Sequence, residues 1–330
     1  MISVVISNFN GRRYLDRLLD SLRRQRGVEI EIVVVDREST DGSVEFLRQQ
    51  SDVRLLTEPA ASGLVSGYSV GARAATGDLL FFANEDLWLD PDCLGQLAAR
   101  IDAGQRVAIA DPWEWDYDGR RLHHAGVRFE NARWDCNSPW PRSRFQFTAP
   151  LTAGERIPFP CAGAFLIHRS CYDDLSGFDT GFFLDFEDVD LGVRAWQRGW
   201  KCATVPDARV FHAVGASNTQ AAGSDAGAET ATPRRYISNR SSLFILVVKT
   251  FSFPALPIAL AGWLVSTANN LYRGRWHRFL WDFAALPEVV RRFPAAWRFR
   301  QANSAYNHYF PGERFFTTPE FRGPAPTRRD

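Results

Sequence analysis

The N-terminal third of the chain alternates short apolar runs with segments of helical spacing. Four apolar runs predict buried strands, at residues 2–6, 31–35, 53–56 and 79–83. Between them, leucines recur at helical spacing from Leu15 to Leu22, capping residues precede a helix through Leu47, and residues 62–76 are small and mildly amphipathic. Strands that alternate with helices indicate an α/β fold, with a mostly parallel central sheet and helices on both faces.

The pattern is less regular after residue 110. Residues 111–160 hold several Trp, Pro and Arg residues without clear periodicity, which predicts irregular structure and short strands. Apolar segments at 161–168 and 203–212 predict two further strands of the sheet. Between these strands, Val189, Val193 and Trp196 share one helical face, so a helix is expected to begin near Asp188 and to end near Gly199.

Composition changes again towards the C-terminus. Residues 218–233 are small and polar, which predicts a flexible loop, and residues 234–330 are expected to be mainly helical. Residues 250–268 carry no charge, although Pro254, Pro257 and Gly262 interrupt the run. Three arrangements fit this segment: helices that lie on an anionic membrane surface, a subdomain packed on the core, or a spanning helix of about 20 residues. The first is favoured by the flanking Arg273, Arg275, Arg278, Arg291, Arg292, Arg298 and Arg300, with Trp276, Trp281 and Trp297.

Charge and cysteine content narrow the class of protein. In 330 residues, 39 basic side chains nearly balance 38 acidic ones, so no overall field favours a nucleic-acid partner. The five cysteines are odd in number and lack the paired spacing of zinc sites, which fits free thiols in a reducing compartment. The first residues lack the features of a signal peptide and begin a strand directly. We therefore expect a cytoplasmic protein.

Polar side chains follow two of the predicted strands at the point where each strand ends. Asp36 follows the run 31–35, and Asn84, Glu85 and Asp86 follow the run 79–83. Because ligands of open α/β sheets bind at the carboxyl ends of the strands, these groups predict a binding site there. Carboxylate oxygens suit a hard divalent cation, whereas a simple strand-end turn capped by Asn and Asp is the structural alternative.

Six segments, taken in order, resemble the motifs of inverting family-two glycosyltransferases of the GT-A fold. They are VVISNFNG, VVVDRESTDGS, GDLLFFANED, FPCAGAFLIHR, GFDTGFFLDFEDVDLGVRAWQRGW and VPDARVFHAVGAS. Agreement of several motifs in the correct order is far more specific than any one of them. The resemblance is to the bacterial rhamnosyltransferase-like branch and implies a catalytic domain over residues 1–217. Its nucleotide-binding half would span about 1–110 and its acceptor half about 111–217, where the irregular segment would shape the acceptor pocket.

The resemblance implies roles on the donor side. Asp36 matches the Asp that hydrogen-bonds the base or ribose, and Asp41 matches a second nucleotide-side Asp, with helix capping as its alternative. Asn84, Glu85 and Asp86 match the metal motif, in which the last carboxylate binds the Mg²⁺ or Mn²⁺ ion that bridges the nucleotide diphosphate. Asn at the first position departs from the commoner Asp. Arg37-Glu38 stands where the family more often has Asn-Gly.

The resemblance also implies the remaining groups of an active site. His212 matches a histidine that completes the metal coordination, although a lone His at a strand end is more often structural. Asp188 matches the catalytic base that takes the proton of the acceptor hydroxyl, with Glu187 as the second choice and helix capping as the structural alternative. Gly163 and Ala164 match the small-residue segment that lines the acceptor side, and tight strand packing would equally explain the glycine.

The resulting prediction is a metal-dependent inverting glycosyltransferase. Its donor is expected to be a nucleotide sugar, with dTDP-L-rhamnose as the best candidate on the branch resemblance alone. The acceptor would be a glycan or lipid-linked sugar of the cell envelope, and the enzyme would be peripheral on the inner face of the plasma membrane. A UDP-hexose or UDP-N-acetylhexosamine transferase is one alternative. A catalytically dead scaffold that binds nucleotide is another.

Overall fold

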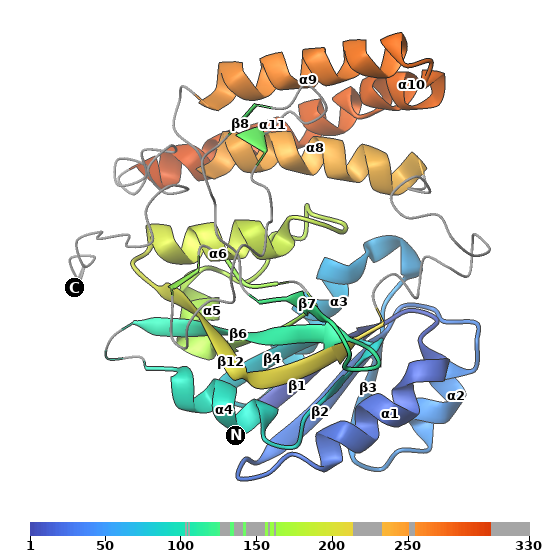
Figure 1. The fold of residues 1–330 in the computed structure, drawn as a ribbon, viewed down its shortest axis with the longest axis vertical. Coiled ribbons are helices and arrows are strands. Elements are labelled where there is room, and N and C mark those ends of the chain that lie inside the picture. The colour runs from blue at the N-terminus through green and yellow to red at the C-terminus, as the bar shows by residue number, and fades with distance from the viewer. Residues whose placement is uncertain are drawn as a thin grey trace.

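A single central sheet carries helices on both faces, and a further layer of C-terminal helices covers one of these faces (Figure 1). The computed structural model describes residues 1–102, 104, 106–125, 133–134, 141–142, 156–157, 159–161, 163–213, 233–250 and 255–304. Most of the predicted irregular segment and the predicted loop at 218–233, except Pro233, therefore lie outside the described residues. So does the predicted domain boundary at residue 217.

The N-terminal half of the sheet is parallel, as predicted. Strand β1 lies between β2 and β4, and β3 forms the edge. The strands are β1 Ile2–Asn8, β2 Ile30–Asp36, β3 Val53–Thr57 and β4 Leu79–Asn84. The intervening helices are α1 Arg12–Arg23, α2 Ser43–Arg48 and α3 Leu64–Ala74, with a short 3-10 turn η1 at Ala60–Ser62. The register pairs Asn8 with Asp36 and Ser7 with Asn84. The polar residues at the strand ends therefore lie together at the carboxyl end of the sheet.

The other half of the sheet is mixed. Strand β11 runs antiparallel to both β4 and β6, and β12 runs parallel to β6. The elements are β5 Leu87–Leu89, α4 Cys93–Arg100, β6 Val107–Asp116, β7 Leu122–His124, β10 Arg156–Ile157, β11 Ala164–His168, α5 Arg169–Asp174, α6 Glu187–Gln197 and β12 Lys201–His212. A separate small ribbon pairs β8 Arg133–Trp134 with β9 Pro141–Arg142. The prediction for residues 111–160 was irregular structure and short strands. Strands β7, β8, β9 and β10 are short, but residues 111–116 belong to the longer strand β6.

Alternate residues of the buried strands supply two apolar cores. On one face, Val4 and Ile6 of β1 pack with the leucines of α1 and α4. On the other face, Val5 packs with Val65 of α3, and the same core continues through α6 into the C-terminal helices. Period-two alternation places successive side chains on opposite faces, so one strand serves both cores.

The C-terminal helices are an integral part of this second core. They are α8 Pro233–Thr250, α9 Ala255–Tyr272, α10 Trp276–Ala284 and α11 Leu286–Ala302. Figure 1 shows α8 and α11 between α6 and the outermost helix α9. Within the described ranges, no helix is long and apolar enough to cross a membrane.

Two of the arginines that suggested a membrane-facing surface are instead buried. Arg292 donates from Nη1 to Ser242 Oγ at 3.1 Å, and Arg300 donates from Nη1 to the carbonyl of Val248 at 3.0 Å. Both contacts join α11 to α8. These arginines therefore hold the packed subdomain together, whereas Arg273, Arg291 and Arg298 are exposed.

Candidate active site

A histidine between two carboxylates lies at the carboxyl end of the sheet. His212 ends β12 and donates from Nε2 to Asp86 Oδ1 and from Nδ1 to Glu114 Oε1, each at 2.8 Å. Asp86 follows β4, and Glu114 belongs to β6. All three side chains are buried. The predicted pairing of Asp86 with His212 in space is thus present in the structure, and Glu114 fixes the orientation of the imidazole from the far side.

The electrostatics of this trio follow from the hydrogen bonds. Burial alone would lower the pKa of His212, but the bonds to Asp86 and Glu114 outweigh burial and raise that pKa to about 10. Burial would raise the pKa of Glu114, but hydrogen bonds from His123 and His212 bring it well below its usual range. The two hydrogen bonds therefore favour the protonated imidazole of His212 between the two acidic side chains.

Gly163 lies against this trio. A Cβ atom at this position would lie 2.6 Å from Glu114 Oε2 and 3.1 Å from His212 Nδ1. Its carbonyl accepts a hydrogen bond from the backbone N–H of Asn84 at 3.0 Å. The tight-packing explanation therefore accounts for the glycine. Ala164 begins β11 opposite Ala83, and its side chain is buried in the core. Acceptor contacts at both residues stay predictions.

We expect Gly163→Ala to disturb the trio rather than the fold as a whole. The added methyl must displace Glu114 or the imidazole of His212, and such overpacking costs about 1–3 kcal/mol. If His212 is a metal ligand, we expect a clear loss of Mn²⁺ affinity with only a small decrease in the unfolding temperature. Calorimetry of Mn²⁺ with nucleotide, beside thermal unfolding, measures both. Unchanged metal affinity in a folded variant would contradict the expectation.

Asn84 and Glu85 occupy distinct surroundings. Asn84 Oδ1 accepts a hydrogen bond from the hydroxyl of Tyr68 at 2.7 Å, which orients the amide at the strand end. Glu85 is buried, and burial together with the neighbouring Asp86 charge raises its pKa to about 7. Because their surroundings differ, these two adjacent carboxyl groups are not equivalent, and Asp86 is the one that faces His212.

The predicted nucleotide-side carboxylates both have backbone partners. Asp36 is buried and accepts from Asn8 Nδ2 at 2.6 Å and from the N–H of Ser39 at 2.9 Å. Asp41 accepts from the N–H of Arg12, at the start of α1, and from the N–H of Ser43, at the start of α2. The capping expected for Asp41 is therefore present at two helices. Nucleotide contacts by either residue stay predictions.

The pair Glu187-Asp188 opens helix α6. Glu187 is buried, and burial together with the Asp188 charge raises its pKa well above the usual value. Asp188 is only half-buried, and its Oδ1 accepts from the N–H of Val189 at 2.7 Å. Two residues before the helix, Asp185 and Phe186, have φ angles of +67° and +70°. A left-handed pair without glycine is strained and is found where the surrounding structure fixes the backbone.

The sequence analysis missed a second cluster of hydrogen-bonded polar side chains beside the trio. His124 of β7 bonds Asp111 of β6 through Nε2 at 3.1 Å, and the same carboxylate accepts from the N–H of Cys161. Burial would lower the pKa of His124, but Asp111 and then the charges of Glu114 and Asp188 raise it. The acidic residues Asp111 and Glu114 within strand β6, which also ends at Asp116, were the available signal for this cluster.

Comparison with known proteins decides the family. The family model described as "Glycosyl transferase family 2" matches residues 3–176. The chain belongs to glycosyl transferase family 2. The match includes Asp36, Asp86 and Gly163, whereas α6 and His212 lie beyond it.

Two mycobacterial proteins are similar over much of the chain. One, from Mycobacterium tuberculosis, is named N-acetylglucosaminyl-diphospho-decaprenol L-rhamnosyltransferase and is 28% identical over 239 residues, which are 64% of this chain and 76% of the relative. The other, an uncharacterised protein of the same species, is also 28% identical and covers 80% of this chain and 81% of its own length. The predicted likeness to rhamnosyltransferases is thus confirmed at the level of a homologue.

Solved structures show the same GT-A fold. GalNAc-T7 with UDP, GalNAc and Mn²⁺ matches with a TM-score of 0.60 at 19% identity, over 89% of this chain and 57% of that chain. The mannosyltransferase PcManGT of Pyrobaculum calidifontis, in complex with GDP-Man and Mn²⁺, matches with a TM-score of 0.51 at 18% identity, over 93% of this chain and 87% of that chain. The predicted fold, including the helices after the catalytic sheet, is therefore confirmed.

The side chains at the strand ends offer ligand atoms that fit a divalent cation. Asp86 offers carboxylate oxygen, and His212 offers an imidazole nitrogen whose far side is already oriented by Glu114. No set of three His, Cys, Asp or Glu side chains among the described residues is arranged to hold an ion unaided. Mg²⁺ is usually bound by one or two carboxylates, with substrate phosphate oxygens and water as the other ligands, so Asp86 alone satisfies its protein requirement.

Proposed function

We propose that this protein is a metal-dependent inverting glycosyltransferase that uses a nucleotide sugar. The observation that carries the proposal is the contact of Asp86 with His212 at the carboxyl end of the sheet, the edge that also holds Asp36 and Asn84. A cation held by these two residues would bind the donor diphosphate and offset the charge on that leaving group. A sheet that only bound nucleotide would still use this pair to hold the diphosphate, but it would not need the half-buried carboxylate Asp188 at the start of α6.

The remaining groups act on the two substrates. Asp36 would accept hydrogen bonds from the base or ribose, and Asp41 holds the two helix ends beside it. Asp188 would take the proton of the acceptor hydroxyl as that oxygen attacks the anomeric carbon from the face opposite the diphosphate. The nucleotide leaves with the bonding electrons of the broken glycosidic bond. Glu187, with its raised pKa, is suited to stay neutral beside the base.

We propose dTDP-L-rhamnose as the donor sugar nucleotide. The support is the similarity to the mycobacterial rhamnosyltransferase, because the catalytic groups themselves are equally compatible with a UDP-hexose or UDP-N-acetylhexosamine donor. Hydrolysis assays with dTDP-, UDP- and GDP-sugars, each with Mg²⁺ or Mn²⁺, separate these donors. Absence of turnover with all of them, despite nucleotide binding, would favour the catalytically dead scaffold.

We further propose a lipid-linked or glycan acceptor of the cell envelope and a peripheral position on the inner face of the plasma membrane. The named relative acts on a diphospho-decaprenol-linked sugar, which supports an acceptor confined to a membrane. Five of the seven arginines between residues 255 and 304 are exposed or half-buried, and this positive charge suits an anionic leaflet.

We expect Asp86→Ala to remove metal-supported nucleotide binding, because the diphosphate would lose its counter-ion and His212 its partner. Calorimetry with dTDP or UDP and Mn²⁺ measures the change, and loss of a charged ligand should weaken binding at least about 10-fold. Asp207→Ala is the matched control, since Asp207 is an exposed carboxylate on the same strand as His212. Equal affinity in Asp86→Ala, or binding that persists under excess chelator, would reduce the Asn84–Asp86 segment to a strand-end turn.

A further inference from the structure

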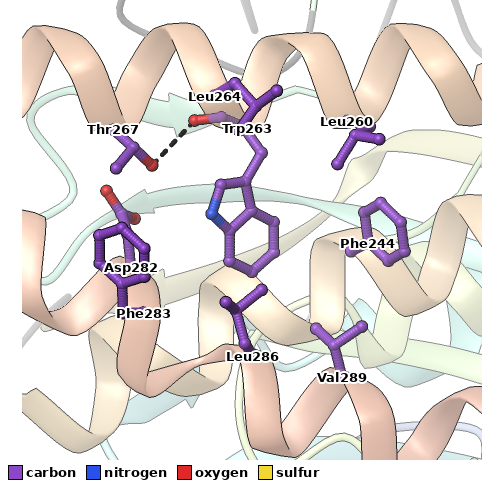
Figure 2. A pocket seen from close by; sticks show the side chains of 9 residues that line it. All are labelled: Phe244, Leu260, Trp263, Leu264, Thr267, Asp282, Phe283, Leu286 and Val289. Atoms are coloured by element: carbon purple, nitrogen blue, oxygen red, sulfur yellow. Dashed lines mark hydrogen bonds between the residues drawn. The ribbon is translucent and has the colours of Figure 1, made fainter.

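An apolar pocket lies between the C-terminal helices, away from the strand ends that form the candidate active site. Its cavity volume is about 130 Å³ and it is partly open to solvent, so it has room for a small apolar group such as part of a hydrocarbon chain. Figure 2 shows Trp263 of α9 in its centre, with Leu260 and Leu264 on the same helix and Leu286 and Val289 of α11 on the opposite wall. Phe283 of α10 closes one end.

The two polar side chains in the wall are already satisfied within the protein. Thr267 donates its hydroxyl hydrogen to the carbonyl of Trp263 at 2.9 Å. Asp282 accepts from Arg240 Nε at 2.6 Å, from the hydroxyl of Tyr236 at 3.0 Å and from Asn270 Nδ2 at 3.0 Å. Apart from these two side chains and the indole N–H of Trp263, the wall consists of hydrocarbon, so it suits an apolar occupant.

The pocket opens onto an exposed apolar face. Among the described residues, every exposed large hydrophobic side chain except Met1 lies on α9, α10 or α11. Tyr272 is 90% exposed, Val290 71% and Leu264 62%. Scattered apolar residues on a surface are normal, but a gathering of this kind on one layer of helices indicates an interaction site.

Arginines lie on or between the same helices. Arg273, Arg291 and Arg298 are exposed, while Arg275 and Arg278 are half-buried. Of the two acidic residues of the layer, Asp282 is buried against Arg240 and Glu288 neutralises Arg291. Arg273, Arg275, Arg278 and Arg298 therefore leave the layer with net positive charge. A second copy of this chain on the same face would bring like charges together across a twofold axis. An anionic bilayer meets both the apolar and the cationic groups.

We propose that the pocket between α8, α9, α10 and α11 binds the hydrocarbon chain of a phospholipid, while the surrounding face rests on an anionic leaflet. The inference deepens the proposed membrane position, on which it rests, by giving that position a defined lipid site. A chain drawn into the pocket buries methylene groups that a flat contact would leave in the leaflet, so it orients the enzyme as well as holding it.

Photolabelling of the full-length protein tests the site. The probe is a vesicle of phosphatidylcholine and phosphatidylglycerol that carries a diazirine on one acyl chain, and peptide mass spectrometry locates the label. We expect label on residues 260–289 of the wild-type chain. Leu286→Trp should fill the pocket and lower this label about 10-fold, because exclusion of two methylenes is enough for such a change. Val290→Trp is the matched control, since Val290 is exposed on the same helix and outside the pocket wall.

Leu264→Asp is a second test, because Leu264 lines the pocket but is exposed enough to be replaced without loss of folding. Equal labelling in Leu286→Trp and Val290→Trp would overturn the proposal. So would a dimer in solution that buries the face and prevents labelling of residues 260–289. The labelling needs no donor or transfer, so a failed site and a failed glycosyltransferase assignment are distinguished by nucleotide binding, which Leu286→Trp should retain.

Discussion

Asp188→Asn is expected to lower sugar transfer by about 10²–10⁴-fold and to leave donor binding nearly unchanged. The carboxylate at the start of α6 would act on the acceptor hydroxyl and not on the nucleotide. Asparagine keeps the size of the side chain and can still accept from the N–H of Val189, so the helix start should persist. Only the ability to take a proton is removed.

Single-turnover transfer with a saturating donor, beside calorimetry of the nucleotide, separates these two effects. Glu187→Gln is the matched control. Because burial raises the pKa of Glu187 well above its usual value, the neutral form of that carboxyl is favoured, and glutamine resembles that form closely. Its effect on turnover should therefore be small. The reverse outcome, with Asp188→Asn active and Glu187→Gln inactive, would transfer the role of base to Glu187.

The backbone before α6 explains why Asp188 can be held in one place. Asp185 and Phe186 adopt left-handed conformations, which cost about 1–3 kcal/mol each and persist only where neighbours enforce them. Arg235 of α8 pairs with Asp185, with Nη2 to Oδ1 at 3.0 Å. The C-terminal helices therefore contact the segment that carries the proposed base.

Much of the catalytic sheet could be predicted because its strands are short apolar runs with clear boundaries. The polar strand ends Asp36 and Asn84 were found for the same reason, and parallel pairing brings them to one edge. Strand β6 was missed because Pro112 and alternating Trp and acidic residues interrupt its pattern. Proline has no N–H to donate to a neighbouring strand. The sheet accommodates Pro112 because the pairing of β6 with β12 shifts register directly after it.

Contacts between distant segments could not be predicted from local pattern. Nothing beside Glu114 in the sequence indicates that it bonds His212, which lies 98 positions further along the chain. The sequence likewise does not show that Arg292 and Arg298 differ in burial, yet Arg292 is buried against Ser242 and Arg298 is exposed. Such differences depend on which face of helix α11 packs against the core. Helix α11 contains Pro294 and has no clear separation of apolar and polar faces, so the sequence does not identify the buried face.

A buried ionic cluster links α6 to α8. Lys249 of α8 donates to Asp190 Oδ1 at 2.6 Å and to Asp179 Oδ2 at 2.7 Å. Asp190, two residues after the proposed base, also accepts from Arg194 Nε at 2.7 Å. Lys249 and Asp190 are both buried. Removal of α8 would leave these carboxylates with one cation fewer in an apolar setting, so truncation before Pro233 would test folding rather than membrane binding.

We expect Lys249→Met to lower the free energy of unfolding by about 3 kcal/mol. Loss of one partner from a buried ion pair costs about 3–5 kcal/mol, and the lower end applies because Asp190 keeps Arg194. Methionine fills a similar volume, so the loss reports charge rather than a cavity. Urea unfolding measures the change, and Arg291→Met is the matched control, because its pair with Glu288 is on the surface and should contribute less than about 1 kcal/mol. A Lys249→Met protein as stable as this control would mean that the cluster does not anchor the C-terminal helices to the catalytic domain.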